Sequence, residues 1–352
     1  MKPSILVYAP SWIGDAVMSL GALRSLRRAY PDSRLAVLAK PWVKELYECC
    51  EAVDETLQYD PGKSRAVRGL LRTAGMLREA KFDLAVLFPN AFRAAAIVWA
   101  ARIPERWGYA HDGRGLLLTK PVPPPARPFG RHQAYYYLDL LRHLGVETGQ
   151  PDTHLNLTVP MRAKALELLG NPNGHDDGRA LVGIHPGATN SRAKRWIPER
   201  YAEVGDRLAA SHNARIVLLG GPSEQGIADE IRSHLKTPSV NLAGKTSLGE
   251  LMGLVGSLSI LLSNDSGPLH VASALGVPTI AVFGPTDERE TGPLSPKARV
   301  VRHHVECSPC LLKECPIDHR CMDRVTVEDV YGASVDLLEG TGSRERARMA
   351  SP

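Results

Sequence analysis

The chain has 352 residues, of which 43% are hydrophobic and 23% are charged. This balance is typical of globular proteins and excludes long disorder, collagen and coiled-coil architectures. The length suggests about two domains. No apolar run reaches the roughly 18 residues of a membrane-spanning helix. The short apolar run near the N-terminus lacks the features of a signal peptide, so we expect a cytoplasmic protein.

The net charge of +5 is unevenly distributed along the chain. Residues 1–150 contain 21 Lys and Arg against 14 Asp and Glu, a charge of +7, whereas residues 151–352 carry −2. A basic half favours an anionic partner such as nucleic acid, a phospholipid surface or a phosphorylated glycan. A solvated basic surface without a ligand is the alternative.

Short apolar strands alternate with helical patterns through most of the sequence, which predicts an α/β protein with parallel sheets covered by helices. Strands are expected at residues 5–8, 35–38, 83–88, 180–184, 216–219, 259–262 and 279–283, and helices at 16–29 and from about 43. A Pro-rich stretch and a loop-type composition in the middle predict a domain boundary between about 150 and 178. Ligands bind at the carboxyl ends of the strands in such sheets, so the candidate residues lie in those loops.

The loop after the first expected strand, residues 9–15, lacks the Gly-rich pattern of nucleotide-binding loops. It ends in Gly14 and Asp15 at the start of an expected helix. Asp15 is either a helix cap or a catalytic carboxylate that takes a proton from an attacking sugar hydroxyl.

Three loops of the second half have the composition of a nucleotide-diphosphate site. Residues 185–196 place three cations within four residues, which would attract a diphosphate, although an exposed basic loop is the alternative. In residues 219–224, Glu224 is either a ribose ligand or a charge at a helix start. Residues 263–270 lead into a helix whose N–H groups would bind phosphate. His270 there is a ligand contact or a core histidine.

Motifs in these loops resemble the ADP-heptose lipopolysaccharide heptosyltransferases of glycosyltransferase family 9. The matching stretches are SWIGDAVM at 11–18, HPGATNSRAKRW at 185–196, GGPSE at 220–224, SNDSGPLH at 263–270 and ALGVPTIAVFGPTD at 274–287. They follow the family's order across about residues 4–338. The longer SNDSG stretch and a Cys-rich segment look more like the type II members than the type I members.

The resemblance implies a GT-B fold, in which two Rossmann-like domains flank a cleft and a C-terminal helix crosses back to the first domain. Residues 1–160 are then the acceptor-binding domain and 161–325 the ADP-heptose-binding domain. Residues 326–340 are expected to form a helix on the N-terminal domain, and 341–352 a disordered tail.

The resemblance also implies an inverting, metal-independent transfer of L-glycero-D-manno-heptose from ADP-heptose to the first inner-core heptose of Kdo-lipid A. Asp15 matches the family's proposed general base, and Lys194 matches the cation that neutralises the leaving diphosphate. The implied donor-binding residues are Thr189, Asn190, Glu224, Asp265, Ser266, Gly267 and His270. Asn190 departs from a Thr-Thr pair of some relatives. No cofactor and no catalytic metal is expected.

Other activities are open alternatives at this stage. A type I or type III heptosyltransferase would extend a different core position, and a sugar-nucleotide epimerase of similar fold would leave the acceptor unchanged. No nucleic-acid partner is expected, because the chain contains no motif for one.

A basic helix in the first half is a candidate acceptor surface. The expected acceptor-binding residues are Lys63, Arg65, Arg68 and Arg72. With a glycolipid acceptor, such a helix favours binding to the acceptor and to the cytoplasmic surface of the inner membrane, with which the enzyme would associate peripherally. A solvated helix is the alternative.

Six cysteines occur in the chain. Cys49 and Cys50 are adjacent on an expected helix and are expected to be structural thiols. The other four are Cys307, Cys310, Cys315 and Cys321, whose spacing fits a structural zinc site, free thiols or a loop disulfide.

Overall fold

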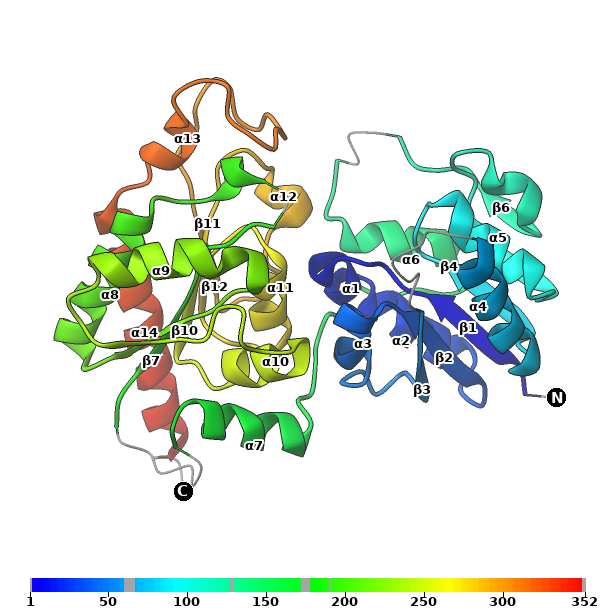
Figure 1. Cartoon of the computed structure of the whole chain (residues 1–352), viewed down its shortest axis with the longest axis horizontal. Coiled ribbons are helices and arrows are strands. Elements are labelled where there is room, and N and C mark those ends of the chain that lie inside the picture. The colour runs from blue at the N-terminus through cyan, green and yellow to red at the C-terminus, as the bar shows by residue number, and fades with distance from the viewer. Residues whose placement is uncertain (1, 60–66, 127–129, 172–177, 190, 350–352) are drawn as a thin grey trace. The chain divides into compact units, whose positions relative to one another are not determined.

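The computed structural model describes residues 2–59, 67–126, 130–171, 178–189 and 191–349; for residues 67 and 341–349 it describes the backbone alone. The chain divides into two compact units, Met1–Asn156 and Leu157–Pro352. Each unit contains a six-stranded parallel sheet flanked by helices (Figure 1). This arrangement confirms the predicted α/β class with two Rossmann-like units.

The sheet of the first unit has the strand order β3-β2-β1-β4-β5-β6. Its strands are β1 (Ser4–Tyr8), β2 (Arg34–Ala39), β3 (Glu55–Gln58), β4 (Leu84–Leu87), β5 (Glu105–Tyr109) and β6 (Lys120–Val122). The predictions of β1, β2 and β4 are confirmed, because these strands are nearly continuous apolar runs buried on both faces. Strand β6 lies in the Pro-rich stretch, where Pro121 is tolerated because β6 pairs on one side only.

Helices cover both faces of this sheet. They are α1 (Ile13–Met18), α2 (Leu20–Ala29), α3 (Pro41–Tyr47), α4 (Val67–Glu79), α5 (Phe92–Ala100), the 3₁₀ turn η1 (Arg114–Leu117) and α6 (Ala134–His143). Helices α1, α2, α3 and α6 contact one another, and α4 contacts α5. The helix expected over 16–29 starts earlier and breaks at Ser19, whose hydroxyl donates to the Ala16 carbonyl at 2.8 Å. Such a local hydrogen bond competes with the helical ladder.

The second unit repeats the same topology, with the order β12-β11-β10-β7-β8-β9. Its strands are β7 (Leu181–His185), β8 (Arg215–Leu218), β9 (Ser239–Asn241), β10 (Ile260–Asn264), β11 (Thr279–Val282) and β12 (Ala298–Val301). The four strands predicted from apolar runs are β7, β8, β10 and β11. The two outermost strands, β9 and β12, have half-buried or exposed residues and were not predicted.

The helices of the second unit also form two layers. They are α7 (Val159–Leu168), α8 (Pro198–His212), α9 (Gln225–His234), α10 (Leu248–Gly256), α11 (Gly267–Ala274), α12 (Glu288–Thr291), α13 (Arg320–Asp323) and α14 (Val327–Met349), with 3₁₀ turns η2 (Arg192–Lys194) and η3 (Pro222–Glu224). Helices α8, α9 and α14 lie on one face, and α7, α10 and α11 contact one another on the other.

The C-terminal helix α14 forms where a helix was predicted, at residues 326–340. Its main contacts are with α8 and with strands β10, β11 and β12, and Val330 and Leu337 are buried in that core. These contacts lie within the second unit. The packing of residues 326–340 on the N-terminal domain stays a prediction. The helix also continues to Met349, through residues predicted to be a disordered tail.

Both sheets have the Rossmann strand order, in which the first and fourth strands are neighbours at the point where the direction of winding reverses. In the first unit these strands are β1 and β4, and in the second unit they are β7 and β10. The loops that follow such a pair diverge to opposite faces and leave a crevice for a ligand. Asp15 follows β1, whereas Thr189 and Lys194 follow β7 and Asp265 follows β10.

Arg24 of helix α2 binds the last segment of the first unit through the backbone of residues 152 and 154. It is only 7% exposed, and its guanidinium donates to Glu51 at 2.7 Å and to the Asp152 carbonyl at 2.7 Å. It also donates to the His154 carbonyl. One buried cation therefore satisfies two backbone acceptors that no helix or strand satisfies.

We expect Arg24→Met to lower the free energy of unfolding by about 2–3 kcal/mol, because the buried carbonyls lose a charged donor while the apolar stem is kept. Urea denaturation would measure this loss. The matched control is Arg28→Met, since Arg28 is exposed on the same helix and should change stability by less than about 0.5 kcal/mol. Equal effects of the two substitutions would contradict the anchoring role of Arg24.

Candidate active site

The predicted donor residues of the second unit lie in loops at one edge of the sheet. Thr189 and Lys194 follow β7, Glu224 follows β8, and Asp265 follows β10. Strands β8, β7 and β10 are neighbours in the sheet, so their carboxyl ends meet. The structure thus brings together residues that are far apart in the sequence.

Asn264, the last residue of β10, fixes the loop after β7. Its buried Oδ1 accepts hydrogen bonds from the Trp196 backbone N–H at 3.0 Å and from the Tyr201 hydroxyl at 2.9 Å. Its Nδ2 donates to the Pro186 carbonyl at 2.6 Å. One amide side chain therefore holds both ends of residues 186–196, the loop predicted to bind the sugar-nucleotide donor and called the donor loop below.

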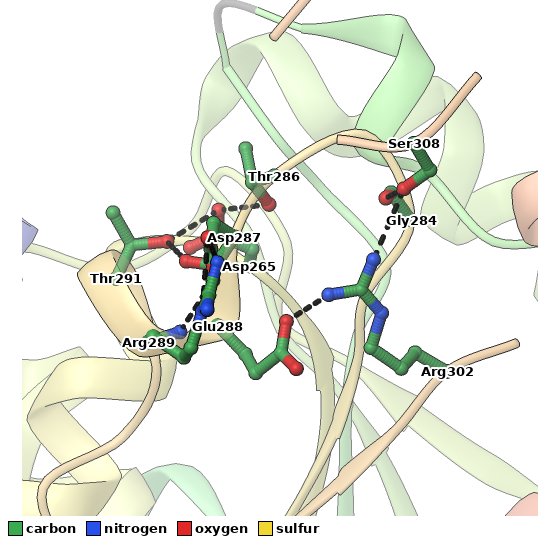
Figure 2. A network of polar contacts seen from close by, with 9 residues as sticks. All are labelled: Asp265, Gly284, Thr286, Asp287, Glu288, Arg289, Thr291, Arg302 and Ser308. Carbon is green, nitrogen blue, oxygen red and sulfur yellow. Dashed lines mark hydrogen bonds and ion pairs between the residues drawn. The ribbon is translucent and has the colours of Figure 1, made fainter. Parts of the chain in front are cut away.

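Lys194 and Asp265 form an ion pair at 2.8 Å. Asp265 is 5% exposed and the Lys194 side chain 26% exposed. The same Asp265 oxygen, Oδ2, also accepts from the hydroxyls of Thr286 at 2.8 Å and Thr291 at 3.3 Å (Figure 2). Two residues predicted for separate roles are thus direct partners.

Thr286 and Thr291 were not predicted as site residues. Thr286 belongs to the GPTD stretch at 284–287, which matches the family but was given no role, so the motif itself was the available signal. Nothing in the sequence marks Thr291, because it reaches Asp265 only through the placement of helix α12.

Helix α12 is braced by a second polar network, also shown in Figure 2. Asp287 caps the helix by accepting from the Arg289 N–H at 2.9 Å, and its carboxylate also pairs with the Arg289 side chain. Arg302 pairs with Glu288 and donates to the Ser308 hydroxyl at 3.1 Å. These contacts keep the threonine donors in a fixed orientation toward Asp265.

The Cys-rich segment, residues 303–321, supports the donor loop. The Ala193 N–H donates to the Lys313 carbonyl at 3.0 Å, and the His319 Nε2 donates to the Ala193 carbonyl at 2.6 Å. The Leu311 N–H donates to the Pro285 carbonyl at 2.8 Å. The segment therefore contacts the loops that carry both Lys194 and Thr286, a role that its composition did not reveal.

All six cysteines, which lie among the described residues, have their thiols outside disulfides. Cys49 and Cys50 are buried, but they follow the end of α3 at Tyr47 and do not lie on the expected helix. Burial raises the pKa of Cys321, and the charges of the other three thiols of the Cys-rich segment raise it further. Within the described part of the chain, the only set of three or more His, Cys, Asp or Glu side chains with ligand atoms all within 4.8 Å is the exposed Glu199, Glu230 and His234. The four thiols are not arranged as zinc ligands, so the geometry does not support a structural zinc.

Glu224 is buried, with 3% of its surface exposed, and is held by hydrogen bonds. Its Oε2 accepts from the His185 Nε2 at 3.2 Å and from the Gly221 N–H at 2.8 Å, and its Oε1 accepts from the Thr189 hydroxyl at 3.4 Å. Burial raises the pKa of Glu224, but these donors and the charges of His185 and Arg195 outweigh it and lower the pKa to about 2. The carboxylate is therefore ionised at neutral pH.

The remaining residues predicted to bind the sugar-nucleotide donor have different environments. Ser266 precedes α11 and Gly267 is its first residue, so both lie where helix N–H groups are free of helical partners. His270 is buried in the same helix, and its contact with the donor stays a prediction. Asn190 lies outside the described residues.

Asp15 lies in the first turn of α1, and the N-cap residue of that helix is Trp12. The Tyr137 hydroxyl from α6 donates to the Asp15 Oδ1 at 3.0 Å. Burial raises the pKa of Tyr137 well above its usual range, and the negative charge of Asp15 raises it further. Tyr137 thus stays protonated and remains a donor, which orients the Asp15 carboxylate at the crevice end of β1.

The predicted acceptor residues are partly described. Arg68 and Arg72 are exposed one turn apart on α4, with the exposed Leu71 beside them. Lys63 and Arg65 lie outside the described residues. Within the described helices, none combines the length and apolar character needed to cross a bilayer.

Comparison with known proteins shows the family to which this chain belongs. The model of glycosyltransferase family 9 (heptosyltransferase) matches residues 70–320. The chain belongs to glycosyltransferase family 9. The chain is 33% identical over 307 residues to the family 9 enzyme lipopolysaccharide heptosyltransferase 2 of Escherichia coli, covering 85% of this chain and 87% of that protein. It is 29% identical to lipooligosaccharide heptosyltransferase 2 of Haemophilus influenzae, covering 85% and 88%.

Solved structures of family 9 agree. The ADP-heptose lps heptosyltransferase II of E. coli superposes with a TM-score of 0.81 at 27% identity, covering 96% of this chain and 99% of that one. A family 9 glycosyltransferase from Veillonella parvula gives 0.86 at 25% identity, covering 96% and 98%. These matches confirm the predicted GT-B fold class and a glycosyltransferase enzyme of the heptosyltransferase family.

We expect Glu224→Gln to remove a pH-dependent part of the stability. Because the pKa of Glu224 falls from 4.5 to about 2 on folding, its contribution is complete above the unfolded value and is lost as the pH falls toward 2. Between pH 6 and pH 3 the wild type should lose about 2 kcal/mol more than the variant in urea denaturation. Glu230→Gln, at an exposed site on α9, is the control. If the free energies of unfolding of wild type and Glu224→Gln fell equally between pH 6 and pH 3, the lowered pKa of Glu224 would be contradicted.

Proposed function

We propose that the chain is an inverting, metal-independent heptosyltransferase. It moves L-glycero-D-manno-heptose from ADP-heptose to the first inner-core heptose of Kdo-lipid A, in lipopolysaccharide core biosynthesis. The observation that carries this proposal is the Lys194–Asp265 pair beside the start of α11, because it sets a cation, an oriented carboxylate and the positive end of a helix together. The names of the similar enzymes from E. coli and H. influenzae support the lipid-linked acceptor.

In the proposed donor site, Lys194 neutralises the diphosphate as it leaves. A phosphate oxygen would compete with Asp265 for the ammonium group, which is partly exposed and on a flexible stem. Asp265 would remain oriented after that exchange, because Thr286 and Thr291 still donate to it. Its carboxylate is then able to accept a hydroxyl of the heptose. The first-turn N–H groups of α11 add positive potential for phosphate.

In the proposed reaction, Asp15 is the general base. Tyr137 holds one carboxylate oxygen, and a carboxylate has several acceptor sites, so the group is still able to take the proton of an attacking sugar hydroxyl. A single in-line displacement at the anomeric carbon inverts its configuration. The leaving ADP is stabilised by preorganised charge at Lys194 and by helix dipoles.

The acceptor side of the proposal rests on helix α4. Its exposed Arg68 and Arg72 suit the carboxylates and phosphates of a Kdo-lipid A core. The exposed Leu71 between them gives this face an apolar component. Such a face favours peripheral association with the anionic cytoplasmic surface of the inner membrane.

The deciding experiment is mass spectrometry of acceptors incubated with enzyme and ADP-heptose. Heptosyl-Kdo-lipid A should gain the mass of one heptose, and Kdo-lipid A without heptose should gain none. Transfer to Kdo-lipid A instead would indicate the type I activity, and transfer only to a core that already carries two heptoses would indicate type III. An unchanged acceptor with altered ADP-heptose would indicate an epimerase.

We expect Asp15→Asn to lower kcat by about 10²–10⁴-fold, because the amide cannot accept the proton. The Kd for ADP, measured by calorimetry, should change less than about twofold, since the Lys194 loop belongs to the other unit. The exposed Asp32→Asn serves as the control. Near-normal turnover of Asp15→Asn would remove Asp15 as the base.

We expect Lys194→Gln to lower kcat/KM for ADP-heptose by about 10²–10³-fold, because one preorganised charge is lost from the transition state. Affinity for ADP should fall with it. Lys297→Gln, at an exposed position of the same unit, is the matched control and should leave both values unchanged. Wild-type kinetics in Lys194→Gln would exclude its phosphate role.

A further inference from the structure

We propose that His185 is a positioning residue of the donor site, which holds Ser266 and Glu224 in one arrangement and so couples the phosphate end of the site to its ribose end. This inference rests on the proposed function and on the sequence-based expectation that Glu224 contacts the adenosine ribose and that Ser266 belongs to the phosphate-binding turn. No role for His185 follows from the motif in which it stands.

The geometry places the His185 ring between two loops. His185 is the last residue of β7 and is 2% exposed. Its Nε2 lies 3.2 Å from the Glu224 Oε2, and its Nδ1 lies 3.2 Å from the Ser266 Oγ. Glu224 follows β8 and Ser266 follows β10, the two neighbours of β7 in the sheet. One buried ring therefore bridges the loops on both sides of its own strand.

The chemistry of the carboxylate sets the direction of one of these hydrogen bonds. An ionised carboxylate only accepts, so Nε2 of the ring donates to Glu224. The Ser266 Oγ is hydrogen-bonded to Nδ1 and also lies 3.0 Å from the Ser263 Oγ, so it bridges two side chains. With these partners Ser266 orients the turn, while the first-turn N–H groups of α11 are the phosphate donors.

Glu224 is fixed in place on its other side as well. A Cβ at Gly187 would lie 2.0 Å from the Glu224 Oε1, so only glycine permits this approach. Within the described residues, Oε2 accepts two hydrogen bonds, whereas Oε1 accepts one, from Thr189 at 3.4 Å. Oε1 therefore keeps capacity to accept ribose hydroxyls.

The coupling makes a specific prediction for Ser266, which does not lie at the ribose end. Removal of its hydroxyl takes away the hydrogen bond to the His185 Nδ1 and loosens the ring that orients Glu224. Ser266→Ala should therefore weaken the recognition of ribose hydroxyls. A hydroxyl that touched phosphate alone would affect nucleotides with and without those hydroxyls equally.

The test measures the affinities of ADP and 2′,3′-dideoxy-ADP for the full chain by calorimetry. Wild type should prefer ADP, and His185→Phe, which fills the buried volume without polar atoms, should weaken ADP about tenfold. Its affinity for the dideoxy nucleotide should stay within about twofold of the wild-type value. His185→Gln, which keeps a donor for Glu224, should restore part of the preference. In the wild-type background, Ser266→Ala should reduce the preference for ADP over the dideoxy nucleotide. In the His185→Phe background, Ser266→Ala should leave that preference unchanged.

Several outcomes would overturn the proposal. Equal losses for both nucleotides in His185→Phe would indicate a general structural role, and unchanged ADP affinity would indicate no role. An additive effect of Ser266→Ala in the His185→Phe background would break the coupling. If wild type binds neither nucleotide, the proposed donor site itself is wrong. Circular dichroism melting identifies a misfolded His185→Phe, in which case His185→Gln and Ser266→Ala carry the comparison.

Discussion

The buried amide of Asn264 is the interaction on which the second unit's site depends. It stands at the end of β10 and bonds the backbone at Pro186 and Trp196, one on each side of the loop that carries Lys194. Its oxygen also accepts from Tyr201 of helix α8. A buried polar group is stabilising only when its partners are all present, so this amide favours one loop conformation over others. The positions of Lys194 and Thr189 follow from that choice.

Around this anchor, each acid of the site is paired with a donor from another loop. Asp265 accepts from Lys194 and from two threonines, and Glu224 accepts from His185 and Gly221. Both carboxylates are nearly inaccessible to water, so their hydrogen bonds are stronger than they would be at the surface. The charges are thus oriented before any substrate arrives, which is the condition for electrostatic catalysis with little reorganisation. The Cys-rich segment contributes by holding Ala193 next to Lys194.

The strands that could be predicted from the sequence are those that form continuous apolar runs, because they are buried on both faces. Strands β1, β2 and β4, and β7, β8, β10 and β11, are apolar on both faces because helices cover both sides of each sheet, and all seven were recognised. The outer strands β3, β6, β9 and β12 are short and partly exposed, so they do not form continuous apolar runs. Helix α14 was expected only because the family resemblance implied it. Its contacts with α8 and with strands β10, β11 and β12 come from the tertiary structure.

The sequence by itself determined the α/β class, the two Rossmann-like units and the family, because strand periodicity and motif order are local properties. It also identified Asp15, Lys194, Glu224 and Asp265 as candidate residues. Only the tertiary structure decided which of these are partners. Lys194 and Asp265 are 71 positions apart, and His185 and Glu224 are 39 positions apart. Their meeting depends on strand order, which brings the ends of β7, β8 and β10 together, and on side-chain direction, which composition does not encode.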